Sequence, residues 1–156
     1  MNGKAIVSMA QISPVWLDKK ATLKKVENSI NLASKDDADL VVFGESLVPG
    51  YPFWLALTEG AKWDLKINKT LYSHYVNNAV DIENGDLDTI CSLSKKLKVA
   101  IYLGLVERAA DRGGHSLYCT LVYINKWGEI RSTHRKLQPT YDERLTWANG
   151  DGNGLI

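Results

Sequence analysis

The run LVVF at residues 40–43 constrains the fold of this chain most, because four consecutive apolar residues form a strand with no polar face. Such a strand is typical of a sheet that is covered on both faces. A second short apolar strand is predicted over residues 4–12, and an amphipathic helix over residues 18–34 lies between the two, with Asp18 as its cap. Strand, helix and strand with short connections indicate a βαβ-like unit.

The remaining pattern continues this alternation. The expected elements are a helix in two pieces over 55–80 split near Gly60, a helix capped near Asn84 or Asp86, a strand over 99–108, and a hairpin with arms 116–124 and 129–135. Together they predict an α/β sheet covered on at least one face by helices. Leu155 and Ile156 look like the opening of another strand, so we expect the chain to stop before its fold is complete.

Length and charge exclude several classes of protein. The 156 residues suit one domain or part of a larger one, and the formal net charge of +1 indicates neither a nucleic-acid partner nor an anionic membrane. No apolar run reaches the ~20 residues of a membrane span. The N-terminus lacks the apolar core and cleavage site of a signal peptide, so we expect a cytoplasmic location. Two cysteines suit a reducing compartment and show no metal-ligand spacing.

Two polar residues stand at positions where a ligand would bind. Glu45 follows the buried strand at 40–43, and Lys136 follows the second arm of the hairpin. Ligands of open α/β sheets bind beyond the carboxyl ends of strands, where a carboxylate can act as a general base and a lysine can stabilise an oxyanion. Position alone leaves an equal alternative, in which Glu45 caps the following segment and Lys136 is a solvated strand end.

The sequence motifs around these two residues decide between the alternatives. The segments VVFGESLVPGYPFW and HRKLQPTYDERLTWANGDGNGL resemble the nitrilase superfamily of carbon–nitrogen hydrolases, and they occur in the family order. The run HRKLQPT followed by ER, W and GDG is most similar to the nitrilase branch, and so is the PGYP that follows Glu45. The resemblance covers essentially the whole chain.

The resemblance implies an α/β fold of a particular kind, the four-layer α-β-β-α sandwich. We expect residues 1–156 to be the N-terminal part of a single carbon–nitrogen hydrolase domain, with the sandwich incomplete. By motif, Glu45 takes the role of the general base, Lys136 that of the cation near the tetrahedral intermediate, and Glu143 that of a second, supporting glutamate. We therefore expect the tips of Glu45 and Lys136 to converge, and Glu143 to point toward Lys136.

The implied reaction is hydrolysis of an organic nitrile to the carboxylic acid and ammonia. A nitrile carbon is a poor electrophile and requires a strong, soft nucleophile such as a thiolate. The family's cysteine follows the GDG loop and therefore lies beyond this chain. Cys91, in a predicted helix, and Cys119, in a predicted strand, are expected to be small core residues, and neither has a neighbouring base in a matching motif. The reaction requires no cofactor and no metal.

Several alternatives stay open. An amidase, or an enzyme acting on cyanide, could use the same residues, and a truncated, non-catalytic fragment or assembly subunit is the alternative from another class. The expected partners are a small-molecule nitrile or amide and further copies in a homo-oligomer, because family members associate widely. Tyr51 and Trp54 would line the entrance for an aromatic or bulky aliphatic substrate, unless they simply pack beneath their loop. His134, like the other histidines, is expected in a loop or at the surface.

Overall fold

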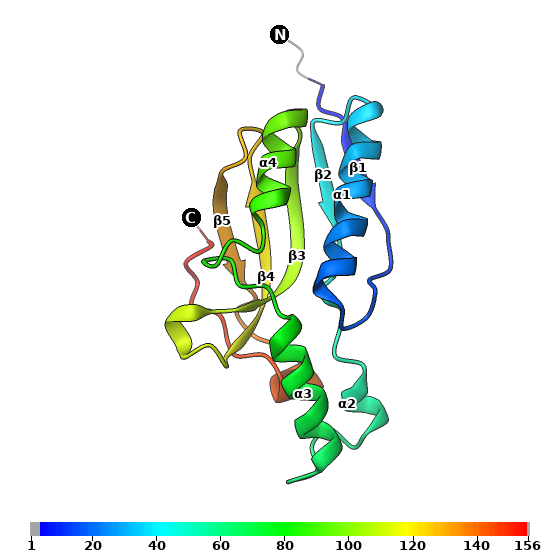
Figure 1. Cartoon of the computed structure of the whole chain (residues 1–156). Coiled ribbons are helices and arrows are strands. Elements are labelled where there is room, and N and C mark those ends of the chain that lie inside the picture. The colour runs from blue at the N-terminus through cyan, green and yellow to red at the C-terminus, as the bar shows by residue number, and fades with distance from the viewer. Residues whose placement is uncertain (1–3, 156) are drawn as a thin grey trace.

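The computed structural model describes residues 4–155, which form one sheet and a set of helices in alternation (Figure 1). The elements in chain order are β1 (Val7–Ala10), α1 (Lys19–Lys35), β2 (Leu40–Phe43), α2 (Trp54–Leu57), α3 (Lys66–Asn78), α4 (Asp88–Leu97), β3 (Ala100–Arg108), the 3₁₀ turn η1 (Ala110–Arg112), β4 (Leu117–Ile124), β5 (Ile130–Arg135) and the 3₁₀ turn η2 (Tyr141–Leu145). No helix among these residues combines the length and apolar character needed to cross a membrane.

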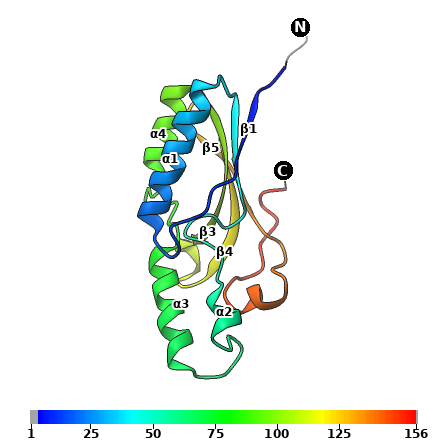
Figure 2. The same ribbon diagram turned by 90° about the vertical axis from the view of Figure 1, so that its right-hand side faces the viewer.

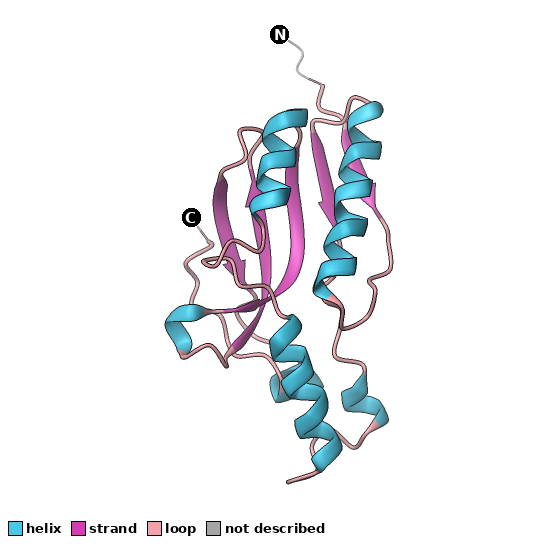
Figure 3. Cartoon of the chain, viewed as in Figure 1, coloured by secondary structure: helices cyan, strands magenta, loops and turns pink. Residues whose placement is uncertain are grey.

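The five strands form one sheet in the order of the chain (Figure 3). β1, β2 and β3 are parallel, whereas β3, β4 and β5 are antiparallel. The parallel half follows from the helical crossovers, and the antiparallel half follows from the hairpin that joins β4 to β5. Gly128, at φ +81°, makes the hairpin turn possible, because glycine adopts positive φ without steric cost.

The main core lies between the sheet and two helices. Figure 2 shows α1 and α4 on one side of the sheet, and the segment after β5 on the other. Val26 and Ile30 of α1 and Ile90 of α4 pack there against Val41 of β2 and Leu103 of β3, each at most 1% exposed. Burial of these side chains fixes which face of each strand meets the helices, because alternate residues point to opposite faces.

The structure confirms an α/β fold and shows two adjacent layers, one of helices and one sheet, within residues 4–155. One expectation about the sheet is wrong in part. Val41 and Phe43 are buried, but Leu40 and Val42 are only half-buried, so β2 is not covered equally on both faces. The helices cover the side of Val41 and Phe43, and the other face of β2 is where a cavity opens.

Most predicted elements are present, with differences at their ends. Asp18 accepts a hydrogen bond from the Ala21 N–H at 2.8 Å and caps α1 as expected. The predicted cap of α4 is wrong, because Leu87 occupies that position while Asp86 binds Lys19 Nζ at 2.6 Å instead. β1 is shorter than the predicted 4–12. The strand expected at 155–156 is absent at Leu155, and Ile156 lies outside the described residues.

Candidate active site

Glu45 is placed by a close backbone contact between two strands. It lies two residues beyond β2, where the Gly44–Glu45 backbone rests directly on Gly104 of β3. A Cβ atom on Gly104 would lie 2.2 Å from the Gly44 carbonyl oxygen and 2.8 Å from Glu45 Cα. Three residues further on, the Val48 carbonyl accepts a hydrogen bond from Val106 N–H at 2.7 Å, which ties the segment to β3.

Gly104 was not singled out by sequence reasoning, although a signal was present. An isolated glycine within a strand pattern marks a bulge or a close backbone approach, and Gly104 stands alone in the AIYLGLVER strand. Gly104 marks a close backbone approach and not a bulge. It brings the end of β2 against the middle of β3, and with it the side chain of Glu45.

Lys136 continues the edge of the sheet by one residue. Its N–H donates to the Cys119 carbonyl at 2.8 Å and so extends the β4–β5 ladder beyond Arg135. Its own carbonyl accepts from Gly150 N–H at 3.0 Å, so the returning C-terminal loop fixes the backbone from the other side. The lysine side chain is thereby directed from a rigid strand end, which holds a functional group more precisely than a free loop does.

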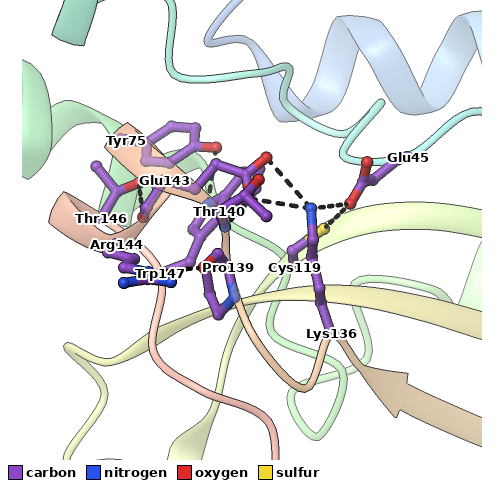
Figure 4. Close-up of polar contacts among 10 residues, drawn as sticks. All are labelled: Glu45, Tyr75, Cys119, Lys136, Pro139, Thr140, Glu143, Arg144, Thr146 and Trp147. Carbon is purple, nitrogen blue, oxygen red and sulfur yellow. Dashed lines mark hydrogen bonds and ion pairs between the residues drawn. The ribbon is translucent and has the colours of Figure 1, made fainter.

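The side chain of Lys136 lies between two carboxylates (Figure 4). Its Nζ donates to Glu45 Oε1 at 2.8 Å and to the two oxygens of Glu143 at 2.9 and 3.2 Å. The expected convergence of Glu45 and Lys136 is confirmed, and so is the expected direction of Glu143. Two negative charges on one ammonium keep it protonated and oriented.

Glu143 is held in place independently of Lys136. Its Oε2 accepts from the Thr140 N–H at 2.7 Å and from the Thr140 hydroxyl at 3.0 Å, in a capping box that opens η2. Burial would raise the pKa of Glu143, but the hydrogen bonds from Thr140 and Lys136 outweigh it and lower this pKa below its ordinary value. Glu143 is therefore a fixed carboxylate that stays ionised.

The charge state of Lys136 follows from the same contacts. Burial alone would lower its pKa, but the hydrogen bonds to Glu45 and Glu143, and their charges, raise this pKa above the ordinary value for a lysine. The amine is therefore a permanent cation. It can stabilise negative charge on a reacting atom, but it is not suited to abstract a proton at neutral pH.

Glu45 and Lys136 border a cavity of about 390 Å³. It lies on the sheet face opposite α1 and α4, because its lining residue Val42 alternates with Val41, which packs in the core with these helices. Its walls are otherwise mostly apolar, and its lining residues are Val42, Phe43, Glu45, Gly104, Cys119, Thr120, Leu121, His134 and Lys136. The Glu45 side chain is 58% exposed, whereas that of Glu143 is 7% exposed. A ligand in this cavity thus meets Glu45 and Lys136, with Glu143 behind the lysine.

The two aromatic residues expected at the entrance differ in position. Trp54 is 2% exposed and packs against Tyr75 with ring centroids 4.7 Å apart, so it belongs to a second hydrophobic core and does not line this cavity. The alternative expectation, that the side chain packs beneath its loop, describes Trp54 better. Tyr51 is half-buried and meets the edge of Trp147 at 5.7 Å. Burial and the nearby charge of Glu143 raise the pKa of Tyr51, but Tyr51 is not among the residues that line the cavity.

Cys119 is a core residue as expected, and it also has a neighbouring carboxylate that its own sequence segment did not indicate. It is 4% exposed, and its Sγ lies 3.3 Å from Glu45 Oε1, within donor distance. Sequence reasoning missed this contact because it arises from pairing between residues 74 positions apart. Cys91 is partly buried in α4 and packs at the main core, as predicted.

His134 also differs from its expected position. It lies within β5 and lines the cavity, and its Nδ1 is buried without a hydrogen-bond partner among the described residues.

Within residues 4–155, no group of three or more histidine, cysteine or acidic side chains is arranged to hold a metal ion.

Known proteins were compared with the chain by sequence and by structure. Residues 6–156 match the carbon–nitrogen hydrolase family. The chain is 37% identical over 154 residues to a nitrilase 2 from an unknown prokaryotic organism, covering 98% of this chain and 47% of that protein. It is 35% identical over 156 residues to an arylacetonitrilase of Arthroderma benhamiae, covering 99% of this chain and 44% of that protein.

Solved structures share the fold at low sequence identity. An amidase from Nesterenkonia sp. superposes with a TM-score of 0.66 at 14% identity, over 97% of this chain and 50% of that one. A mutant of the Nesterenkonia sp. AN1 amidase gives a TM-score of 0.65 at 13% identity, over 97% of this chain and 50% of that one. That protein carries an acetamide moiety covalently added at its active-site cysteine.

The chain belongs to the carbon–nitrogen hydrolase family, since the match covers nearly all of its residues. Its fold is that of the Nesterenkonia amidases, one of which is described as an amidase from the nitrilase superfamily. The chain spans less than half the length of the curated relatives it matches.

Proposed function

We propose that Glu45, Lys136 and Glu143 are the acid–base part of a site that hydrolyses an organic nitrile to the carboxylic acid and ammonia. The observation that carries the proposal is the position of Lys136 Nζ, between Glu45 at 2.8 Å and Glu143 at 2.9 Å, at the edge of a mostly apolar cavity. A cation fixed by two carboxylates, one of which is exposed, provides charge stabilisation and a base at a single point.

The nucleophile in this proposal is a cysteine outside residues 1–156. Its thiolate adds to the nitrile carbon, and the nitrogen takes up negative charge and a proton to give a thioimidate. Water then adds, ammonia leaves and an acyl-enzyme remains, and a second water releases the acid and restores the thiol. Glu45 accepts the proton of each attacking group and returns it to the nitrogen, or in the last step to the sulfur, and Lys136 stabilises the charge that develops on nitrogen and then on oxygen.

Two features favour a nitrile with an apolar group as the substrate. The relatives at 35–37% identity are named as a nitrilase and an arylacetonitrilase. The cavity beside Glu45 has the side chains of Val42 and Leu121 in its wall, which suits an aromatic or bulky aliphatic substituent. Tyr51 is the aromatic residue that we retain as a substrate contact. Association into a homo-oligomer stays a prediction.

The test is turnover by the protein that continues residues 1–156 to the length of its relatives. Glu45→Gln should lower nitrile turnover by roughly 10²–10⁴-fold, because a general base contributes about that much. Lys136→Met should lower it by about 10²–10³-fold, as the loss of an oxyanion-stabilising donor does. Glu143→Gln should lower it while the protein stays folded.

Matched controls are Glu129→Gln and Lys126→Met in the β4–β5 turn, far from Glu45 in the sheet. Their ammonia release should equal that of the unmodified protein. An amide panel in the same assay distinguishes an amidase, which would hydrolyse amides faster than the matching nitriles. Ammonia release unaffected by Glu45→Gln and Lys136→Met would contradict the proposed site.

A further inference from the structure

The contact between Cys119 and Glu45 is not used by the proposed reaction. Cys119 lies on β4 and points to the same sheet face as Leu121, and both line the cavity that Glu45 borders. Its thiol donates to Oε1 of Glu45 at 3.3 Å, and that same oxygen accepts from Lys136 Nζ at 2.8 Å. One carboxylate oxygen thus has two donors, one from β4 and one from the residue that follows β5.

The second oxygen of Glu45 is in a different situation. Within residues 4–155, Oε2 has no hydrogen-bond partner, and Figure 4 shows it directed away from both Lys136 and Cys119. Two donors on Oε1 leave only Oε2 with a free lone pair toward a ligand. A proton abstracted by Glu45 would therefore arrive at Oε2.

The thiol is suited to this contact only while it keeps its proton. Burial, together with the charge of Glu45, raises the pKa of Cys119 far above the ordinary value for a cysteine. It is therefore a neutral S–H donor at physiological pH and not a thiolate. A neutral donor beside a carboxylate that is 58% exposed restricts the rotation of that carboxylate without cancelling its charge.

We propose that Cys119 is a positioning residue for Glu45: its S–H and the Lys136 ammonium together hold Oε1, so that Oε2 faces the cavity as the proton acceptor. The consequence for catalysis rests on the proposed function, whereas the contact itself does not. Cys119 touches no reacting atom in this arrangement.

Replacement by serine and by alanine separates positioning from packing. Cys119 packs with Leu117, Val106 and Trp147 in the second hydrophobic core, so alanine suits its surroundings and a serine hydroxyl does not. Serine, however, keeps a donor toward Glu45, and alanine does not. A packing role predicts that Cys119→Ala is at least as active as Cys119→Ser, and a positioning role predicts the reverse.

In the full-length protein we expect Cys119→Ala to lower kcat roughly tenfold, which corresponds to ~1.4 kcal/mol, with KM nearly unchanged. Cys119→Ser should recover most of kcat even though its unfolding midpoint is lower than that of Cys119→Ala. The matched pair Cys91→Ala and Cys91→Ser should show no such reversal. Equal activity of Cys119→Ala and the unmodified protein would overturn the proposal, and so would complete loss in both Cys119 variants, since that would make the thiol itself a reactant.

A vibrational measurement tests the contact without any turnover. In the Cys91→Ala background, Cys119 provides the single S–H stretching band in the Raman spectrum of the 156-residue chain. This band should lie at a frequency lowered by the hydrogen bond, and Glu45→Ala should move it upward. A band that Glu45→Ala leaves in place would overturn the inference. Because this result does not depend on activity, it separates failure of the inference from failure of the proposed function.

Discussion

Single residues decide whether the site can form, and Gly104 is the clearest case. Its missing side chain lets the backbone of Gly44 and Glu45 pass within van der Waals contact of β3. Any larger residue would compete with the Gly44 carbonyl for the same space. The position of Glu45 therefore depends on a residue that carries no chemistry.

We predict that Gly104→Ala destabilises the fold by roughly 1–3 kcal/mol, as overpacking of a close contact does. The new Cβ would lie 2.2 Å from the Gly44 carbonyl oxygen, so the backbone must shift. Gly44→Ala is the control, because its Cβ would meet no atom within 4 Å. Urea unfolding of both variants measures the difference, and equal stabilities would show that the contact is looser than described.

Glu143 connects the site to the stability of the fold. Its pKa is lowered in the folded protein, so the stability it contributes is present above its ordinary value of 4.5 and is lost as the pH falls through the lowered value. We predict that Glu143→Gln, which removes this ionisation, is less stable than the unmodified protein near neutral pH. The difference should shrink at acid pH well below 4.5. Urea unfolding across this range measures it, and a difference that is independent of pH would argue against a fixed, ionised Glu143.

At the scale of elements, β5 and the loop that follows it are fastened by a buried ion pair on the opposite side of the strand from Lys136. Arg135 donates through Nε and Nη2 to the two oxygens of Glu107 at 2.9 and 2.6 Å, and through Nη1 to Asp151 at 2.8 Å. Thr120 donates to the same Glu107 at 2.7 Å. The guanidinium thus joins β5 to β3 and to the returning loop, and Glu107 extends the network to β4, directly beside the catalytic candidate Lys136.

We predict that Arg135→Ala destabilises the protein by about 3–5 kcal/mol, because it leaves Glu107, 6% exposed, as an uncompensated buried charge. Arg131→Ala on the same strand is the matched control. Both side chains of the Arg131–Glu129 ion pair are exposed, and their charged atoms lie 3.9 Å apart, so loss of the pair should cost at most ~1 kcal/mol. Denaturant unfolding of the two variants checks the contrast, and similar losses would show that the Glu107 pair does not fasten β5.

The elements themselves were largely predictable from local patterns, and the exceptions have physical causes. Asp18 capped its helix as expected, since a cap is a local hydrogen bond. Asp86 did not, because Lys19, far away in sequence, offered it a stronger partner. Trp54 resembled an entrance residue by its neighbours in the motif, but its ring is buried against Tyr75 of α3. Contacts between distant segments decided these two cases, and a pattern along the chain does not contain them.

The same limit applies to the site. The placement of Glu45 and Lys136 after strand ends, together with the motifs around them, was enough to predict that they converge. Strand ends meet at the edges of a sheet. The contact of Cys119 with Glu45 depends on the register of β4 with its neighbours and on the shift of the Gly44–Glu45 backbone over Gly104. Neither is visible in the spacing of the residues.

For the molecule as a whole, the fold brings three charged groups together: an exposed carboxylate, a fixed ammonium and a buried carboxylate behind it. The cavity beside them opens on the sheet face opposite α1 and α4. The thiol nearest to them, Cys119, is protonated and serves another role in our proposal. The central claim is therefore that these groups act with a thiolate from outside residues 1–156.

Ammonia release from aromatic and aliphatic nitriles tests this claim most directly, with the 156-residue chain measured beside the protein that continues it to the length of its relatives. We predict release by the longer protein only, because loss of the nucleophile from a cooperative catalytic set lowers turnover by several orders of magnitude. Turnover by the 156-residue chain that survives Cys91→Ala and disappears with Cys119→Ala would contradict the claim and identify Cys119 as the nucleophile.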